Sequence, residues 1–166
     1  VERFYSTKQR SIGMNNFPAL NFPTFDFSLE QHQQQWYIFD IIRKKKILLT
    51  PEEWVRQHLI RFLIDYLNYP ISLIQVEYGI NIKQKQFRID VAAFSRLSMP
   101  LLLCECKAPT IKLSPKTIGQ AAMYNLHQQA PYLLITNGLT HYCSHYDGQQ
   151  WHTLKEIPDF EKIGID

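Results

Sequence analysis

Residues 101–109 read Leu101-Leu102-Leu103-Cys104-Glu105-Cys106-Lys107-Ala108-Pro109, an apolar run that carries two charges. Such a run is typical of a central strand with both faces buried. Unpaired buried charge is costly, so two charges in this strand indicate that they gather at one site. In an extended chain, side chains two residues apart share a face and lie roughly 6–7 Å apart. The stretch therefore predicts a strand that presents Glu105 and Lys107 together.

A second strand is predicted just upstream, over Phe87-Arg88-Ile89-Asp90-Val91-Ala92-Ala93-Phe94, and residues 95–100 suit a turn. The two strands can pair as neighbours, which would bring Asp90 beside Glu105. Two carboxylates offer the oxygen ligands that Mg²⁺ seeks, and a lysine can neutralise a phosphate or position water. The pattern favours phosphodiester hydrolysis. The alternative is a salt bridge on a solvated edge strand, which the flanking leucines disfavour.

A helix is predicted to begin after Thr50, a suitable N-cap, with Pro51 in the first position. Glu52 and Glu53 place negative charge where the helix dipole favours it. Apolar residues recur at helical spacing: Val55, Leu59, Phe62, Leu63, Tyr66 and Leu67. Residues 68–70, Asn-Tyr-Pro, end the helix. Glu52 lies near the buried stripe, whereas Glu53 lies about a hundred degrees round the helix axis.

The rest of the chain predicts a second helix and further strands. Ser114-Pro115 opens the helix, in which Gln120 and Tyr124 are one turn apart. Strands over residues 132–136 and 139–146 flank Asn137-Gly138, a two-residue hairpin signal, and one more strand lies around residues 151–154.

The fold class that follows is α/β (α+β), with a mixed central β-sheet flanked by helices. The expected order is helix, three strands, helix and strand, with extra C-terminal strands. The first three strands, over residues 73–82, 87–94 and 101–107, would form a meander.

In four stretches, taken in order, the chain resembles the PD-(D/E)xK, or restriction-endonuclease-like, nucleases. The closer likeness is to the N-terminal nuclease domain of type I restriction enzyme R subunits, and it covers residues 39–146. The stretches are residues 49–57, residues 88–90, residues 104–109, and Gln120 with Tyr124. One departure is Ile89, which precedes Asp90 where the family name has proline. The resemblance implies the restriction-endonuclease-like core for the strand order given above.

The resemblance also implies roles for individual residues. Asp90 and Glu105, with the backbone carbonyl of Cys106, would hold one or two Mg²⁺ (or Mn²⁺) ions. Lys107 would orient the attacking water and balance developing charge. A glutamate of the first helix would reach the metal site; Glu52 is favoured over Glu53, and the alternative is that both only complement the helix dipole. The remaining two expected site residues, which would flank the pocket, are Gln120 and Tyr124.

Length and composition fit one domain. The 166 residues, 45% hydrophobic, can bury one sizeable core, which we assign to residues 39–166 after an N-terminal extension, residues 1–38. Residues 1–13 lack periodicity and are expected to be disordered or to precede a natural start at Met14. Residues 15–27 alternate Phe, Pro and Asn and are expected to wrap the domain or a partner.

Charge permits nucleic-acid binding without requiring it, since the formal net charge is +3. Basic residues gather at residues 43–46 and at Lys83, Lys85 and Arg88, which would either track a phosphate backbone or form solvated turns.

The chemistry of the cysteines and the hydropathy narrow the setting. Three cysteines, two of them alternating on one strand, indicate a reducing compartment. Their number and spacing argue against a disulfide framework and against a zinc site. No apolar run approaches the roughly 20 residues that span a bilayer, so we expect a cytoplasmic protein without membrane contact. No phosphate-binding loop of the Gly-x-x-x-x-Gly-Lys type occurs, so the chain would act alone, as a homo-oligomer, or with separate restriction subunits.

The sequence thus predicts a metal-dependent nuclease that hydrolyses DNA, linked to restriction or DNA repair. Two alternatives stay open. One is a nucleic-acid-binding module on the same fold that does not cut. The other is an interaction protein whose aromatic N-terminal arm docks a partner.

Overall fold

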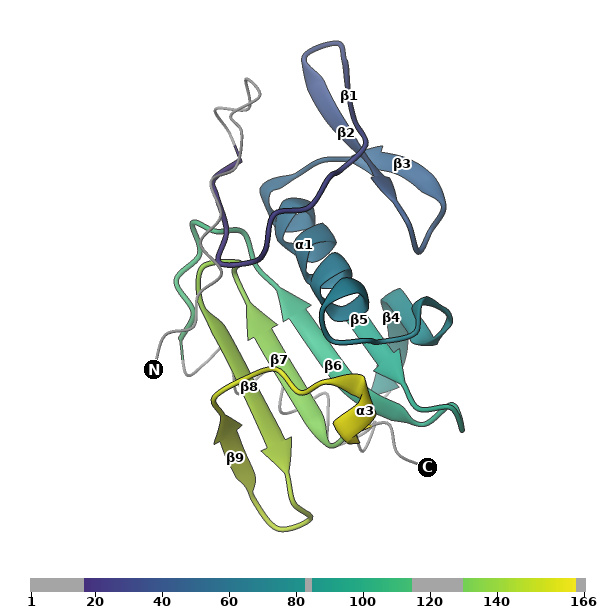
Figure 1. The fold of residues 1–166 in the computed structure, drawn as a ribbon, viewed down its shortest axis with the longest axis vertical. Helices are drawn as coiled ribbons and strands as arrows, with labels where there is room; N and C mark the ends of the chain where they lie inside the picture. The colour runs from purple at the N-terminus through teal and green to yellow at the C-terminus, as the bar shows by residue number, and fades with distance from the viewer. Residues whose placement is uncertain (1–16, 83–84, 115–129, 164–166) are drawn as a thin grey trace.

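A three-stranded sheet opens the computed structural model, which describes residues 17–82, 85–114 and 130–163. Its antiparallel strands are β1 (Leu29–His32), β2 (Gln35–Asp40) and β3 (Lys45–Leu48), in that spatial order. Helix α1 (Pro51–Asp65) follows and lies across one face of a second, larger sheet (Figure 1). A short 3-10 turn, η1 (Ile71–Leu73), leads into that sheet.

The larger sheet has six strands in sequence order. They are β4 (Ile74–Ile82), β5 (Lys85–Phe94), β6 (Pro100–Cys106), β7 (Tyr132–Thr136), β8 (His141–Tyr146) and β9 (Trp151–Leu154). Strands β6 and β7 are parallel and the other neighbours are antiparallel, so the sheet is mixed, as expected. A short helix, α3 (Phe160–Ile163), ends the described chain. None of the helices within the described ranges is long and apolar enough to cross a membrane.

Helix α1 begins where the sequence predicts. The Thr50 hydroxyl accepts a hydrogen bond from the Glu53 N–H at 3.1 Å, which satisfies one of the free amides of the first turn. Val55, Leu59 and Leu63 are fully buried against the sheet. The apolar stripe is shorter than expected, because Tyr66 lies past the last helical residue and is 46% exposed, and it is wider, because Trp54 and Ile60 are also buried.

The apolar side chains of the β4–β5 hairpin switch from one face of the sheet to the other along its length. Near α1 its core residues are Ile74, Val76, Val91 and Ala93, and farther along they are Tyr78, Ile80, Phe87 and Ile89, which pack in a separate cluster. In a regularly alternating strand, Val76 and Tyr78 would lie on one face, and so would Ile89 and Val91. The change occurs at Glu77 and Asp90. Backbone pairing skips Glu77, whose φ is +51°, an uncommon value for a residue other than glycine.

An aromatic strap, defined here as residues 17–28, wraps helix α1, as the sequence predicts for this part of the chain. Pro18 accepts a hydrogen bond from the Trp54 indole at 3.1 Å, and the Asn21 N–H donates to the Gly138 carbonyl at 2.7 Å. Phe25 and Phe27 of the strap pack around the ring of His58. The strap therefore joins α1 to the turn between β7 and β8.

Two local expectations need correction. The loop between β7 and β8 has four residues instead of two, because Thr136 pairs with His141. The Asn137 side chain accepts hydrogen bonds from the backbone N–H groups of Leu139 and Thr140, at 3.0 and 2.8 Å, and so closes the longer turn. The small sheet was not predicted, and the expected boundary between residues 38 and 39 falls within β2.

Candidate active site

The site forms where strands β5 and β6 separate. Their backbone pairing runs from Phe94 and Pro100 to Val91 and Cys104 and does not extend to the next residues. The Cys106 N–H instead donates to Asp90 Oδ2 at 2.7 Å. The carboxylate thus satisfies an amide that the sheet leaves without a backbone partner, and this bond fixes the Asp90 side chain at the separation.

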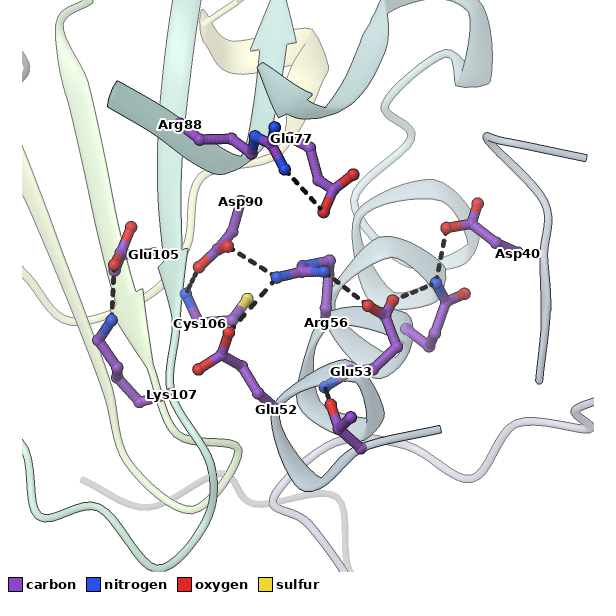
Figure 2. A network of polar contacts seen from close by, with 12 residues as sticks. Asp40, Glu52, Glu53, Arg56, Glu77, Arg88, Asp90, Glu105, Cys106 and Lys107 are labelled. Carbon is purple, nitrogen blue, oxygen red and sulfur yellow. Dashed lines mark hydrogen bonds and ion pairs between the residues drawn. The ribbon is translucent and has the colours of Figure 1, made fainter. Parts of the chain in front are cut away.

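Arg56 of helix α1 reaches the other oxygen of the same carboxylate. Its Nη2 donates to Asp90 Oδ1 at 2.7 Å, and its Nη1 donates to Glu53 Oε2 at 2.6 Å (Figure 2). Glu52 Oε1 lies 3.5 Å from Nη2. Arg56 is only 7% exposed. Burial alone would lower the pKa of its guanidinium, but the charges of Asp90 and Glu53 outweigh burial and raise it.

Glu105 and Lys107 face each other, as their spacing predicts. Lys107 Nζ donates to Glu105 Oε1 at 2.6 Å, and both side chains are partly buried. Burial, followed by the charge of Asp90, raises the pKa of Glu105. Burial acts to lower the pKa of Lys107, yet its hydrogen bond to Glu105 and the carboxylate charges raise it, so the lysine is cationic at neutral pH. The charge of Asp90 thus acts on Glu105; that the two carboxylates share one metal site stays a prediction.

The two glutamates of the first helical turn have different surroundings. Burial and then the charge of Asp90 raise the pKa of Glu52, and Lys107 acts to lower it. Glu53 is buried on the other side of Arg56. Its Oε1 accepts hydrogen bonds from Arg43 Nη2 and Gln57 Nε2, both at 2.9 Å. Glu52 is thus the one that shares the electrostatic environment of the other candidate site residues.

A buried group behind Glu53 was missed by sequence reasoning. Asp40 is fully buried, and its Oδ1 accepts from the backbone N–H groups of Ile42 and Arg43 at 2.7 and 2.8 Å. Its Oδ2 accepts from Arg43 Nε at 2.6 Å and Gln57 Nε2 at 2.9 Å. The available signal was the spacing: Asp40 lies three residues before Arg43, as Glu53 does before Arg56.

The buried group around Asp40 includes Arg43, the first residue of the basic run at residues 43–46, which the sequence assigned to a phosphate contact or a solvated turn. Arg43 pairs with Asp40 and Glu53, and its Nη1 also lies 3.4 Å from Glu77 Oε2. Lys46 forms an ion pair with Glu30. Arg43 is therefore bound by the protein's own carboxylates. Lys46 is paired with Glu30 but half exposed, and Lys44 and Lys45 are also exposed, so the three lysines lie on the surface.

The oxygen donors fit a hard divalent cation. Within the part of the chain that the structure describes, no three His, Cys, Asp or Glu side chains gather closely enough to hold a metal ion by themselves. Mg²⁺, however, is usually held by one or two carboxylates and keeps several waters. Asp90 and Glu105 supply two, and the pKa of Glu105 is raised by burial first and then by the negative charge of Asp90, which a cation would offset. The expected site residues Gln120 and Tyr124 lie outside the described residues.

Fold and site together define a mixed α+β domain in which carboxylates, a lysine and a buried arginine meet where two strands of its central sheet separate. The chain belongs to the family described as type I restriction enzyme R protein N terminus (HSDR_N), whose model matches residues 51–158. This confirms the family resemblance seen in the sequence.

A solved structure has a similar fold. It is a fragment described as an HsdR subunit of a type I restriction enzyme from Vibrio vulnificus YJ016, with a TM-score of 0.53 and 16% sequence identity. The match covers 69% of this chain and 24% of that chain. At this identity the likeness concerns the fold alone. The comparison with curated proteins gave no match.

Proposed function

We propose that the chain is a metal-dependent nuclease domain with a restriction-endonuclease-like core, which hydrolyses DNA phosphodiester bonds in restriction or DNA repair. The observation that carries the proposal is that Asp90 binds the Cys106 N–H, between the paired Glu105 and Lys107, and that its charge helps to raise the pKa of Glu105. Membership of a family named for type I restriction enzyme R proteins supports it.

The proposed metal ligands are Asp90, Glu105 and the backbone carbonyl of Cys106. A bound Mg²⁺ (or Mn²⁺) would lower the pKa of a coordinated water and stabilise charge on the phosphate and the leaving oxygen. The protein's part is to hold the ligands. The bond from the Cys106 N–H orients Asp90, and Lys107 holds Glu105. Both carboxylates are therefore positioned before any ion arrives, which limits the ordering that binding requires.

Lys107 is proposed to contact the phosphate or orient the attacking water as a cation. Its pKa is raised, so at neutral pH it donates protons in hydrogen bonds and does not act as a base. Its side chain is 30% exposed, so solvent can reach it. Glu52 would complete the metal shell through water, and Gln120 and Tyr124 would brace the pocket or touch the phosphate.

DNA is the proposed substrate, and separate restriction subunits or a second copy of the chain are the proposed partners. The family name supports the restriction setting. The arm that the sequence offered for docking a partner packs, over residues 17–28, on its own helix. That observation weakens the hypothesis of a purely partner-docking protein.

A non-cutting nucleic-acid-binding module is the second candidate function. One observation favours it: both oxygens of Asp90 already have partners, Arg56 and the Cys106 N–H. Such a module would retard DNA in a gel shift without cleaving it, and calorimetry would detect no heat of Mn²⁺ binding.

The test is cleavage of supercoiled plasmid DNA in Mg²⁺ or Mn²⁺, with a chelator as the negative control. Asp90→Asn keeps an acceptor for the Cys106 N–H, and Lys107→Met keeps most of the side-chain volume, so both should fold and both should lose cleavage. The matched controls are Asp65→Asn, at the opposite end of α1, and Lys155→Met, an exposed residue after the edge strand β9, which should cut like the native protein. Native cleavage by Asp90→Asn would refute the assignment.

A further inference from the structure

We infer that Arg56 is a positioning residue that acts as the internal counter-cation of Asp90, and that a divalent cation binding at Asp90 displaces it. The inference rests on the proposed function, because it concerns the same carboxylate. It adds Arg56, which is not among the proposed metal ligands, and a competition between Arg56 and the cation for the Asp90 carboxylate.

The contacts of the guanidinium show how it is held. Its two terminal nitrogens point in different directions, one to Asp90 and one to Glu53 (Figure 2). Its Nε is buried and has no hydrogen-bond partner among the described residues. Arg56 is therefore held at its far end alone. It can release Asp90 and still keep a short charged hydrogen bond to Glu53.

The Glu53 end of this arrangement is the fixed one. Glu53 also accepts from Arg43 and Gln57, and both of these donate to the fully buried Asp40. These contacts join α1 to the small sheet, because Asp40 is the last residue of β2. A change at Arg56 will therefore occur on its Asp90 side.

Repulsion between the cation and the Arg56 guanidinium is the reason that we expect the cation to displace Arg56 from Asp90. With Arg56 in contact, the Asp90 carboxylate is neutralised by a monocation at 2.7 Å. A divalent cation at Asp90 would bring two more positive charges close to the same guanidinium, and Coulomb repulsion at such separations is worth roughly a factor of ten in affinity even at high dielectric. Arg56 thus stabilises the carboxylate when no metal is bound and lowers its affinity for the metal.

The test measures Mn²⁺ affinity by calorimetry on the full chain, with variants whose expected effects have opposite signs. Arg56→Gln removes the competing charge and should bind Mn²⁺ about tenfold more tightly. Glu53→Gln removes the charge of the partner that holds Arg56 away from Asp90, leaves Arg56 to Asp90 and Glu52, and should bind more weakly. Arg56→Lys keeps the charge and should stay near native affinity. A purely structural role predicts weaker binding in both Gln variants, and that result would overturn the inference.

A measurement on the native protein covers the case in which a variant does not fold. In ¹⁵N-arginine-labelled protein, the Arg56 Nε–H signal, assigned with Arg56→Lys, should shift during a Mg²⁺ titration, with the same midpoint as Mg²⁺ binding followed by calorimetry. An unmoved signal at saturation would also overturn the inference. Absence of any cation binding by the native protein would remove the proposed function itself. Binding that needs Asp90 but is indifferent to Arg56→Gln removes this inference alone.

Discussion

His58 should make the stability of this domain depend on pH between neutral pH and about pH 4. Its ring is 1% exposed, its Nδ1 lies 2.8 Å from the Trp54 carbonyl, and its Nε2 is buried without a partner among the described residues. A carbonyl only accepts, so Nδ1 carries the proton and donates. Burial lowers the pKa of His58 from 6.5 to about 4, and the hydrogen bond to Trp54 offsets only part of that effect.

The sign follows from which state binds the proton. Between about pH 6.5 and 4, the unfolded chain protonates His58 and the folded protein does not, so the free energy of unfolding falls as pH is lowered. The full effect is on the order of 3 kcal/mol, reached below pH 4. Of this, about 2 kcal/mol should be lost between pH 7 and pH 5, before most carboxylates titrate.

The assay is urea unfolding of the native protein and of His58→Phe at several values between pH 7 and pH 5. Phe fits the aromatic surroundings and cannot titrate, so this variant should show a profile flatter by about 2 kcal/mol over that range. His32→Gln, at an exposed histidine, should keep the native profile. Equal pH dependence in the native protein and His58→Phe would refute the reasoning.

Three further substitutions test other parts of the structure by urea unfolding. Gly138→Ala would place a Cβ 2.7 Å from the Leu20 side chain at a φ of +81°, so we expect a loss of about 1–3 kcal/mol; an unchanged midpoint would contradict the close approach of the strap. Thr50→Ala removes the N-cap hydrogen bond and should cost about 1 kcal/mol, whereas Thr50→Ser should not. Asp40→Asn removes the fully buried anion that pairs with the partly buried Arg43 and should cost about 3–5 kcal/mol; a loss below 1 kcal/mol would show that Asp40 does not anchor this group.

Features set by local chemistry were predictable from the sequence. The N-cap at Thr50 and the pairing of Glu105 with Lys107 depend on residues two or three positions apart, and both are present. The approach of Asp90 to β6, where it binds the Cys106 N–H, needs only a hairpin between neighbouring strands. Short sequence separation leaves few alternative arrangements, so residue pattern alone was enough.

Features that depend on tertiary packing were not predictable. The bond between Arg56 and Asp90 joins residues 34 positions apart and exists because α1 lies on β5 at one particular position. Strands β1 and β3 have four residues each with mixed polarity, too few to show a period of two. At Asn137 the side chain competes for the turn amides, which lengthened a loop whose Asn-Gly pair suggested two residues.

The change of face in the β4–β5 hairpin ties the candidate chemistry to the folding of the sheet. If β5 alternated regularly through Asp90, Ile89 would leave its apolar cluster and Arg88, now exposed, would turn inward. An insertion or deletion of a single residue next to Asp90 would therefore misplace the carboxylate and invert the distal half of the hairpin in one step. A change in the length of this hairpin should be tolerated between Ile82 and Lys85, where its two strands join, and should not be tolerated next to Asp90.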